Sequence, residues 1–391
     1  MIVDAVRTPI GRRKGRLAGW HPADLLGHTL TDLLKRTGVD PGRVDDVIGG
    51  CVTQVGEQST NVIRNAWVGA GLPQDVSATT VDRQCGSSQQ AVHFAAQGVL
   101  AGAYDLAVAC GVESMTRAPM ASNASGGQGP FSHSYLDVID DRLMTQFEVS
   151  QILADQAGIG REEMDALAVE SHRRAHEATE AGWFAEEIVP VPVRDDEGRE
   201  TGEVMTADEG IRPGTTMEVL AGLGSAAKWD PSIAPDITAG NASQTSDGAA
   251  AMLVAERSVA ERLGLPVRAA FRHFAVGGDD AVLVLSAPNP VTRKLLERSG
   301  MSIDDFDAIE CNEAFAVVVL RWAKEFLPDG DLSRLNPRGG AIALGHPLGA
   351  SGVRLMTTLL HELEATGGRY GFQTMCEGGG MANATVIERL A

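Results

Sequence analysis

Residues 77–96, SATTVDRQCGSSQQAVHFAA, decide the fold of this chain because they combine strand, turn and helix signals in one short stretch. The run 77–81 is rich in β-prone residues, 85–88 is a turn of small residues, and 89–96 has a helical pattern. The thiol of Cys85 falls in the turn, where unpaired backbone N–H groups and the positive end of the helix dipole favour thiolate over thiol. We therefore expect an α/β unit that presents a nucleophilic cysteine, although a lone cysteine is also often a small buried apolar residue.

Two segments near the other end of the chain supply what a cysteine nucleophile requires. His346 lies in the sequence GHPLG, between the run 341–345, expected to be the end of a strand, and the helix-like residues 350–356. Cys376 ends a strand-like run and is followed by a glycine-rich turn, whose backbone N–H groups a ligand can approach closely. Acyl transfer through a thiolate needs a base for the thiol proton and donors for the developing oxyanion. A lone histidine or a glycine run is commonly structural, but their combination with a turn cysteine indicates acyl-transfer chemistry.

The chain also repeats itself. Residues 44–51 resemble residues 305–312, at a shift of 261 positions. Cys85 and His346 are separated by the same 261 positions, and each precedes a small-residue turn and a helical pattern. Two matches at one offset predict a duplicated α/β unit, in which equivalent strand-to-helix turns place a nucleophile and a base face to face. Ligands bind at the carboxyl ends of strands in open α/β sheets, where both residues are expected.

Length and composition limit the class of protein. A chain of 391 residues is expected to form two or three domains, and 43% hydrophobic with 22% charged residues is ordinary for a soluble enzyme. The net charge of −19 argues against nucleic-acid binding and against docking on an anionic membrane. Five widely spaced cysteines without a CxxC pair argue against a disulfide framework or a metal site. The sequence shows no signal-peptide pattern and no apolar run near the about 20 residues of a membrane span, so we expect a cytoplasmic protein.

A segment of different character separates the two halves. Residues 119–135 are rich in small and turn-forming residues and are predicted to be a loop, followed by helices over 148–157 and 161–181. We interpret the region 119–245 as an inserted domain that covers the active site. The strand 249–254 then returns the chain to the first half. The predicted domains are an N-terminal half, 1–118 completed by 246–266, the insertion 119–245, and a C-terminal half, 267–391.

Short motifs along the chain carry a family resemblance. They are RTPIG (7–11), CGS (85–87), GVESM (111–115), TAGNAS (238–243), DGAAA (247–251), NEAFA (312–316), GHPLG (345–349) and CEGGG (376–380). With these motifs in the family's order, the chain resembles the thiolases, acyl-CoA C-acyltransferases, over essentially its whole length. The resemblance implies two duplicated βαβαβαββ halves in a five-layer α/β/α/β/α sandwich with an inserted loop domain.

The resemblance also implies a role for each candidate catalytic residue. Cys85 resembles the nucleophile that becomes acylated, and His346 resembles the base that takes its proton. Cys376 resembles the second acid and base, which protonates the acetyl-CoA carbanion as it leaves. Asn312 matches the residue that orients a water, and this water and His346 form the oxyanion site for the thioester oxygen. The backbone N–H groups of Cys85 and Gly378 would form a second oxyanion site for the acyl-enzyme oxygen.

The implied co-substrate is coenzyme A, with no tightly bound cofactor and no metal. The loop domain 119–245 is expected to bind coenzyme A. Arg212 matches a family position near its adenine and phosphate end, although a solvated arginine is an equal reading. Further positions match the lining of the pantetheine tunnel, although they read equally as packing residues: Leu223, Ala239, Ser243, Ala314 and Phe315. Family members are homodimers or homotetramers, and residues 79–83 resemble the strand that pairs across the dimer.

Departures from the family pattern bear on the substrate. Acetoacetyl-specific members carry a His-Met-Gly triplet where this chain has residues 143–150, LMTQFEVS, without a histidine. Residues 49–58, together with residues 146–148, resemble bacterial thiolases that shorten bulky or sterol-derived side chains. Glu377 stands where the family usually has a small or apolar residue. An ionised carboxylate there would raise the pKa of the neighbouring Cys376 thiol if its side chain points inward.

The resemblance therefore implies an acyltransferase. We expect cleavage of a 3-ketoacyl-CoA by CoA to acetyl-CoA (or propionyl-CoA) and a shortened acyl-CoA, through a ping-pong route with an acyl-Cys85 intermediate. One alternative is a biosynthetic acetoacetyl-CoA thiolase or another Claisen-condensing enzyme of the same superfold, which Cys376 disfavours because decarboxylating relatives usually pair their cysteine with histidines or with histidine and asparagine. The other alternative is a non-enzymatic acyl-CoA-binding scaffold. It is disfavoured because every catalytic position of the family carries a catalytic residue in this chain.

Overall fold

The computed structural model describes residues 1–390 and contains two blocks of β-strands. In the first block the strands run in the order β4-β3-β5-β8-β1. Strand β3 is parallel to both β4 and β5, whereas β5 and β8, and β8 and β1, are antiparallel. The bounds are β1 (Ile2–Arg7), β3 (Asp46–Gly50), β4 (Ser77–Val81), β5 (Leu106–Ser114) and β8 (Ser246–Ala255), with the short β2 (Gly11–Arg12) paired to β8.

The second block repeats this arrangement. Its order is β10-β11-β12-β9, with β10 and β11 parallel and the other neighbours antiparallel, which matches β3-β5-β8-β1 pair for pair. The two blocks touch through the single pair Ile2 and Ala269 of β1 and β9. The duplicated unit predicted from the sequence is therefore confirmed. The bounds are β9 (Ala269–Gly278), β10 (Ala308–Cys311), β11 (Tyr370–Glu377) and β12 (Met381–Arg389).

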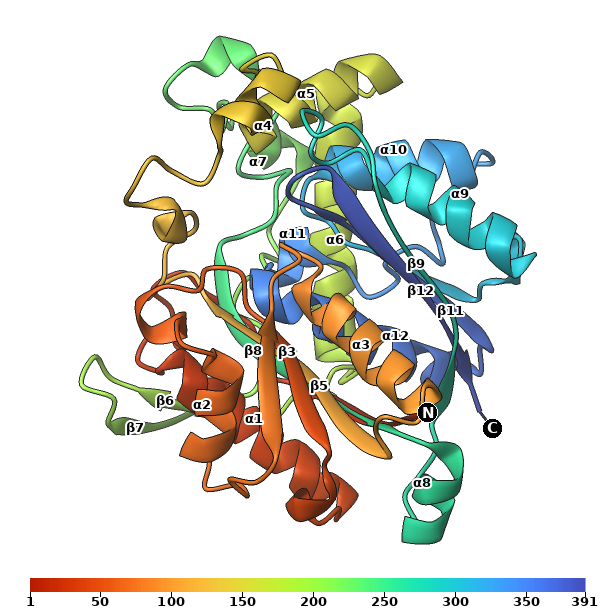
Figure 1. Cartoon of the computed structure of the whole chain (residues 1–391). Helices are drawn as coiled ribbons and strands as arrows, with labels where there is room; N and C mark the ends of the chain where they lie inside the picture. Colours follow the sequence, from red (N-terminus) through yellow and green to blue (C-terminus); the bar gives the residue numbers. More distant parts are fainter. Residues whose placement is uncertain (391) are drawn as a thin grey trace.

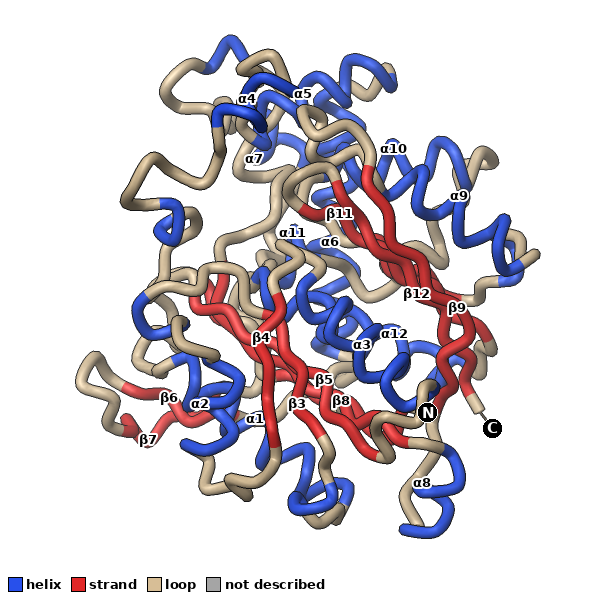
Figure 2. Tube along the Cα trace, in the orientation of Figure 1, coloured by secondary structure: helices blue, strands red, loops and turns tan. Residues whose placement is uncertain are grey.

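Two helices, one from each half, fill the space between the strand blocks. These are α3 (Ser87–Leu100) and α12 (Ser351–Thr366), seen between the blocks in Figures 1 and 2. Each follows one of the two repeated turns, as the sequence predicted. Their apolar side chains share one core cluster, and Val353 N donates to Ser88 Oγ at 3.0 Å where the two helices begin. Gln89 Nε2 also donates to Thr385 Oγ1 at 2.8 Å, which ties α3 to β12. The turn residues at the start of both helices are thereby fixed relative to each other.

Further helices cover the outer faces of both blocks. The first block is covered by α1 (Pro22–Thr37) and α2 (Val62–Gly69), and the second by α9 (Pro288–Ser299) and α10 (Ala316–Phe326) (Figure 1). The layers therefore follow the order helix, sheet, helix, sheet, helix, and the predicted sandwich is confirmed. Two more helices are α8 (Arg257–Leu263), which connects β8 to β9, and α11 (Ala341–Leu344), which precedes His346.

The contact between α3 and α12 leaves no room at Gly352. A Cβ added there would overlap the backbone nitrogen of Gln89. We expect Gly352→Ala to lower the free energy of unfolding by about 1–3 kcal/mol, because one central helix must shift against the other. Gly69 of α2 has open space at the same position, so Gly69→Ala is the matched control and should leave the stability unchanged or raise it by up to about 1 kcal/mol. Urea unfolding followed by circular dichroism measures both, and equal stabilities of the two variants would contradict this packing argument.

The region 119–245 carries its own helices and extends along the molecule. Its residues 133–157 and 217–221 lie at the top of Figure 1, whereas residues 189–205 pack against the core of the first block. The predicted helices are present as α5 (Gln146–Ala157) and α6 (Arg161–Glu180), and α5 begins with a capping box between Thr145 and Glu148. The segment predicted as a loop contains a 3-10 turn at Ser122–Ala124 and the start of α4 (His133–Val138), whose first amides are capped by Ser132. The remaining elements are the hairpin strands β6 (Val191–Arg194) and β7 (Glu200–Met205) and the short α7 (Met217–Ala221).

Candidate active site

Cys85 lies in the turn between β4 and α3, as the sequence predicted. Gly86 N donates to the carbonyl of Arg83 at 3.1 Å, and Ser87 Oγ donates to the carbonyl of Gln84 at 2.6 Å, which closes the turn. The cysteine is 8% exposed and packs in a small cluster with Leu348 and Met375, which lie beside His346 and Cys376 in sequence. The segments that carry the three candidate residues therefore come together around Cys85.

The ionisation of Cys85 differs from the expectation drawn from the sequence. Burial, followed by the nearby Glu377, raises the pKa of the Cys85 thiol to about 12. Hydrogen bonds from the backbone N–H groups of Cys85 and Gly378 to the sulfur act in the opposite direction but are weaker. The prediction that this turn favours a thiolate was wrong for the free protein, because the loss of water outweighs the helix terminus. A thiolate at Cys85 therefore requires a proton acceptor in the site.

His346 is buried and held in a defined orientation. Its Nδ1 lies 2.6 Å from Ser351 Oγ, and that hydroxyl donates its proton to the carbonyl of Pro347 at 2.8 Å. Ser351 Oγ must then accept from the ring, which places the histidine proton on Nδ1 and leaves a lone pair on Nε2. Burial, followed by the charge of Arg354, lowers the pKa of His346 to about 3. The ring is therefore neutral at physiological pH and its Nε2 is available as a base.

The segment before His346 is not the strand end that we expected. Residues 341–344 form the single helical turn α11, and Gly345 leaves it with a φ of 107°. A side chain at Gly345 would also collide with Ser246, so the position needs a glycine for both conformation and space. His346 N is then oriented by the carbonyl of Gln244 and by Ser246 Oγ, both at 3.2 Å. The start of β8 thus fixes the histidine backbone, a long-range contact that no local pattern reveals.

Cys376 lies on β11 opposite Ala382 of β12 and is fully buried. The pKa of its thiol is raised well above its usual range by burial, and next by the electrostatic influence of Cys85. That influence requires the two sulfurs to lie near each other. Cys376 therefore stays a protonated thiol and can donate a proton to a base formed in the site.

Asn312 follows β10 and lies beside His346. Its side-chain Nδ2 is 3.3 Å from His346 Nε2, and its backbone N donates to the carbonyl of Thr374 at 3.1 Å. The buried Oδ1 of Asn312 accepts no hydrogen bond from the residues that the structure describes. A buried amide oxygen of this kind needs a donor, so it is suited to hold a water or a substrate group next to the imidazole.

Two buried carboxylates support the site and were not assigned a role from the sequence. Glu113 accepts hydrogen bonds from the backbone N–H groups of Val52, Thr53 and Gly349 at 2.8–2.9 Å, which ties the loop after β3 to the loop after His346. Glu313 binds Ser171 Oγ, Asn336 Nδ2 and Ile342 N in the same way. Glu113 lies in the motif GVESM and Glu313 in the motif NEAFA. An acidic residue among such small and apolar neighbours is a sequence signal for a buried carboxylate that holds loops together.

The residues predicted to contact coenzyme A fall into two groups. Arg212, Leu223 and Ala239 are exposed, Ser243 is half-buried, and Ala314 and Phe315 are buried. Ser243 N donates to the carbonyl of Ala314 at 2.9 Å, so these two segments adjoin. The backbone N of Arg212 donates to His172 Nδ1 at 3.2 Å, and its side chain is exposed. Ser243, Ala314 and Phe315 are therefore grouped, whereas Arg212 lies at the surface.

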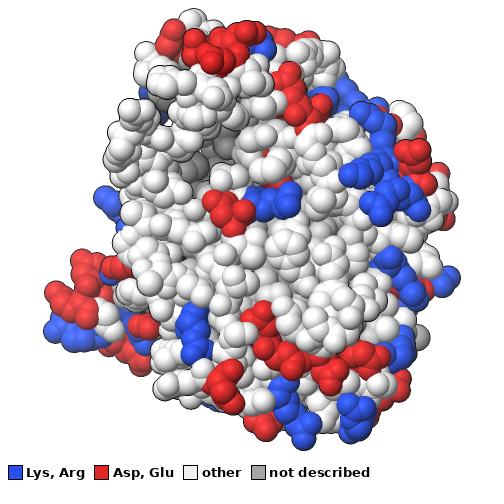
Figure 3. Space-filling model, viewed as in Figure 1, with Lys and Arg blue, Asp and Glu red and all other residues white. Residues whose placement is uncertain are grey.

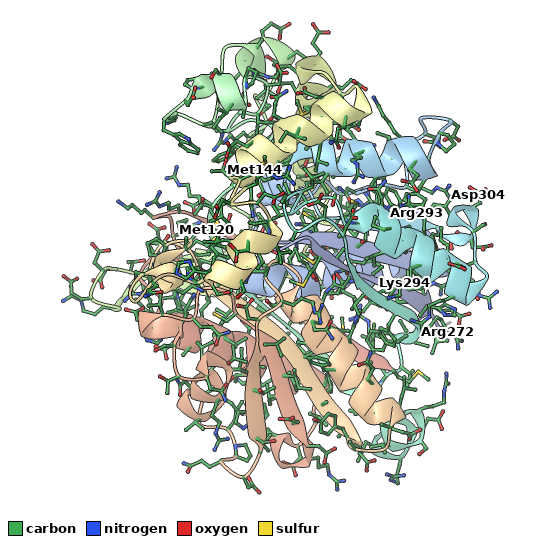
Figure 4. All side chains as sticks on the ribbon, turned by 45° about the horizontal axis from the view of Figure 1, so that its top comes forward. Met120, Met144, Arg272, Arg293, Lys294 and Asp304 are labelled. Atoms are coloured by element: carbon green, nitrogen blue, oxygen red, sulfur yellow. The ribbon has the colours of Figure 1, made fainter. Side chains whose placement is uncertain are left out.

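An aromatic series that the sequence did not reveal begins at Phe315. The ring of Phe147 lies 5.9 Å from the rings of both Phe315 and Trp229. Trp229 is 62% exposed, which is unusual for a side chain of this size. Figure 3 shows a hollow on the face below α4, and Met120 and Met144 lie on the same side of the molecule (Figure 4). Apolar side chains thus gather where the region 119–245 meets the two halves.

A second, basic cavity lies away from the predicted catalytic residues. It measures about 380 Å³ and is lined by residues of α3, β9 and α9, including Arg272, Lys294 and Arg298. Figures 3 and 4 show basic side chains, including Arg272 and Lys294, at this side of the molecule. None of the candidate catalytic or coenzyme A residues lines it. It is therefore not part of the site described above.

The chain was compared with known proteins. Residues 1–258 match the family model for the thiolase N-terminal domain, and residues 265–389 match that for the thiolase C-terminal domain. The steroid 3-ketoacyl-CoA thiolase FadA6 of Mycobacterium tuberculosis is 46% identical over all of this chain and 94% of its own length. The beta-ketoadipyl-CoA thiolase of Escherichia coli is 43% identical over all of this chain and 99% of its own length.

Solved structures agree with these sequence relatives. The crystal structure of the Bacillus anthracis acetyl-CoA acetyltransferase superposes with a TM-score of 0.88 at 35% identity, covering all of this chain and 98% of the other. Within residues 1–390, no helix combines the length and the apolarity needed to cross a bilayer. Both family models together cover nearly the whole chain, and full-length relatives above 40% identity carry thiolase names. The chain belongs to the thiolase family and is an acyltransferase.

Proposed function

We propose that this enzyme cleaves a 3-ketoacyl-CoA with CoA by a ping-pong route through an acyl-Cys85 intermediate. The proposal is supported by the packing of Cys85 with Leu348 and Met375, which lie next to His346 and Cys376 in the sequence. It is also supported by a neutral His346 with an unprotonated Nε2 and by two thiols that stay protonated. A base, a soft nucleophile and a proton donor are what cleavage of a carbon–carbon bond beside a thioester requires.

In the first half-reaction the Cys85 thiol gives its proton to His346 Nε2, and the sulfur attacks the 3-keto carbon. The bond between C2 and C3 breaks, its electron pair passes to C2, and Cys376 gives its proton to C2. Acetyl-CoA leaves, and Cys85 retains the shortened acyl group. The backbone N–H groups of Cys85 and Gly378 stabilise the oxygen on C3, while His346 and a water held by Asn312 stabilise the thioester oxygen.

The second half-reaction restores each group. The Cys376 thiolate takes the thiol proton of CoA, and the CoA sulfur attacks the acyl carbon on Cys85. The Cys85 sulfur leaves and recovers its proton from His346. Arg212 would bind the phosphate end of CoA. The aromatic series of Phe315, Phe147 and Trp229 would face its pantetheine arm. The domain 119–245 would thus cover the site and bind the co-substrate.

We further propose a bulky acyl group of the sterol side-chain class as the substrate. This is supported by the name of the FadA6 relative at 46% identity and by the absence of a histidine in residues 143–150. Large apolar side chains are exposed in the insertion, among them Met120, Phe131, Val138 and Leu143. We also propose a cytoplasmic homo-oligomer, a dimer or a tetramer, that pairs through the free edge of β4.

A thiolysis panel tests the substrate class. Acetoacetyl-CoA, a long straight-chain 3-ketoacyl-CoA and a sterol side-chain 3-ketoacyl-CoA are compared by kcat/KM, with the acyl-enzyme at Cys85 identified by mass spectrometry. We expect the sterol side-chain substrate to be preferred over acetoacetyl-CoA by about tenfold or more, the value of one well-filled apolar contact region. If acetoacetyl-CoA is clearly the best substrate, the biosynthetic alternative is favoured and the argument from residues 143–150 fails.

A further inference from the structure

Glu377 is a buried carboxylic acid with no stabilising partner. It ends β11 beside Cys376, its side chain is fully enclosed, and neither carboxyl oxygen accepts a hydrogen bond from the described part of the chain. Glu113, which is buried to a similar degree, is satisfied by several N–H donors. A carboxylate without such donors is costly to bury, so the protonated form of Glu377 is favoured.

The side chain of Glu377 points into the catalytic centre. A Cβ added at Gly86, the residue after Cys85, would overlap Glu377 Oε1, which places the carboxyl group directly against the nucleophile turn. Asn383 of β12 lies at the same place, with Nδ2 donating to the carbonyl of Gly86 at 3.1 Å and with its own Oδ1 unpartnered. The family's usual apolar residue could not bring a charge to this position.

The ionisable groups that face Glu377 come from two directions. From the turn ahead of α3 these are the Cys85 thiol and the guanidinium of Arg83, and along β11 there is Cys376. Arg83 favours the carboxylate, but burial outweighs it and raises the pKa of Glu377 to about 8. Asp82 lies in the same turn and is acidic, so it does not favour the Glu377 carboxylate. At neutral pH the carboxyl group is therefore mostly protonated, next to a thiol that has to ionise.

We propose that Glu377 and Cys85 share one negative charge, so that Glu377 must keep its proton for Cys85 to become a thiolate. The inference rests on the proposed role of Cys85 as the nucleophile. Glu377 then acts through Cys85 and not on the substrate. Its ionisation sets the pH above which the rate of the reaction stops rising. The Cys85 thiolate forms in the first half-reaction and leaves in the second, so both half-reactions have the same limit.

The direction of the pH effect follows from the like charges. Below about pH 7 Glu377 is neutral and has little influence on Cys85. As the pH rises through the Glu377 pKa of about 8, the carboxylate forms and adds its part to the raised pKa of Cys85, so the thiolate becomes less accessible. The rate of Cys85 chemistry should therefore level off or fall at alkaline pH, where an isolated cysteine would become more reactive.

The test is the pH dependence of Cys85 alkylation by iodoacetamide in the full-length enzyme, measured by peptide mass spectrometry, together with kcat/KM for thiolysis. We expect Glu377→Gln to alkylate up to about tenfold faster than wild type at about pH 9, corresponding to one pKa unit, and to equal it below about pH 7. Thiolysis by this variant should lose its alkaline limb. Glu377→Asp keeps a carboxyl group and should keep the limb.

Arg83→Gln is a second variant that leaves Glu377 in place. Removing this cation should raise the pKa of Glu377 and move the alkaline limb to higher pH. Unchanged pH profiles in both Glu377→Gln and Arg83→Gln would overturn the proposal, as would equal profiles for Glu377→Gln and Glu377→Asp. These outcomes are separable from failure of the nucleophile assignment, because alkylation of Cys85 is measured directly and does not depend on turnover.

Discussion

Cys85→Ser will lower thiolysis by about 10³-fold or more and abolish the acyl-enzyme. A serine hydroxyl in this turn has the same hydrogen-bonding neighbours, but its proton is far harder to remove, and a neutral His346 cannot compensate. Burial already raises the pKa of the cysteine thiol to about 12, and a serine hydroxyl at the same place is a much weaker acid than this thiol. The measurement is steady-state thiolysis combined with intact-protein mass spectrometry after a short exposure to an acyl-CoA.

Cys110→Ala is the matched control for this variant. Cys110 is also a buried cysteine but lies on β5 in the outer apolar cluster of the first half. We expect this variant to acylate and turn over at close to the wild-type rate. A Cys85→Ser enzyme that still cleaved its substrate normally, or acyl label found on another cysteine, would remove the proposed mechanism.

Cys376→Ala will separate carbon–carbon cleavage from acyl transfer. The substitution removes the proton donor for the leaving carbanion, so we expect cleavage of a 3-ketoacyl-CoA to fall by about 10²–10⁴-fold, the usual contribution of a general acid. Transfer of a saturated acyl group from its CoA thioester to Cys85 forms no carbanion. Its leaving group is the CoA thiolate, which needs the Cys376 proton much less because a thiol is a far stronger acid than the C2 position of a thioester. That reaction should therefore fall by a much smaller factor than cleavage.

The second measurement makes this experiment selective. Acylation of Cys85 by a saturated acyl-CoA is followed by mass spectrometry on a short time scale, beside cleavage of the matching 3-ketoacyl-CoA. Equal losses of both reactions in Cys376→Ala would show that Cys376 mainly maintains the site structure, since the carbanion depends on a proton donor far more than the CoA thiolate does. Retention of both would assign carbanion protonation to another group.

Much of the fold followed from local patterns. The shift of 261 positions predicted the duplicated sheets, and the strand, turn and helix around Cys85 appear where residues 77–96 placed them. Such signals are local because backbone preferences and side-chain periodicity act over a few residues. The expected strand end at 341–345 is instead the turn α11, because Ser246 and Gln244, distant in sequence, hold His346 from the start of β8.

The sequence by itself determined the family, the duplicated sandwich and the identity of the candidate catalytic residues, because motif spacing and residue chemistry are properties of the chain. Only the tertiary structure decided their ionisation and orientation. Burial reversed the expected preference of Cys85, Ser351 selected the proton position on His346, and Glu377 turned inward against Gly86. These outcomes depend on desolvation and on partners brought from remote segments, and neither quantity is encoded in any short stretch of sequence.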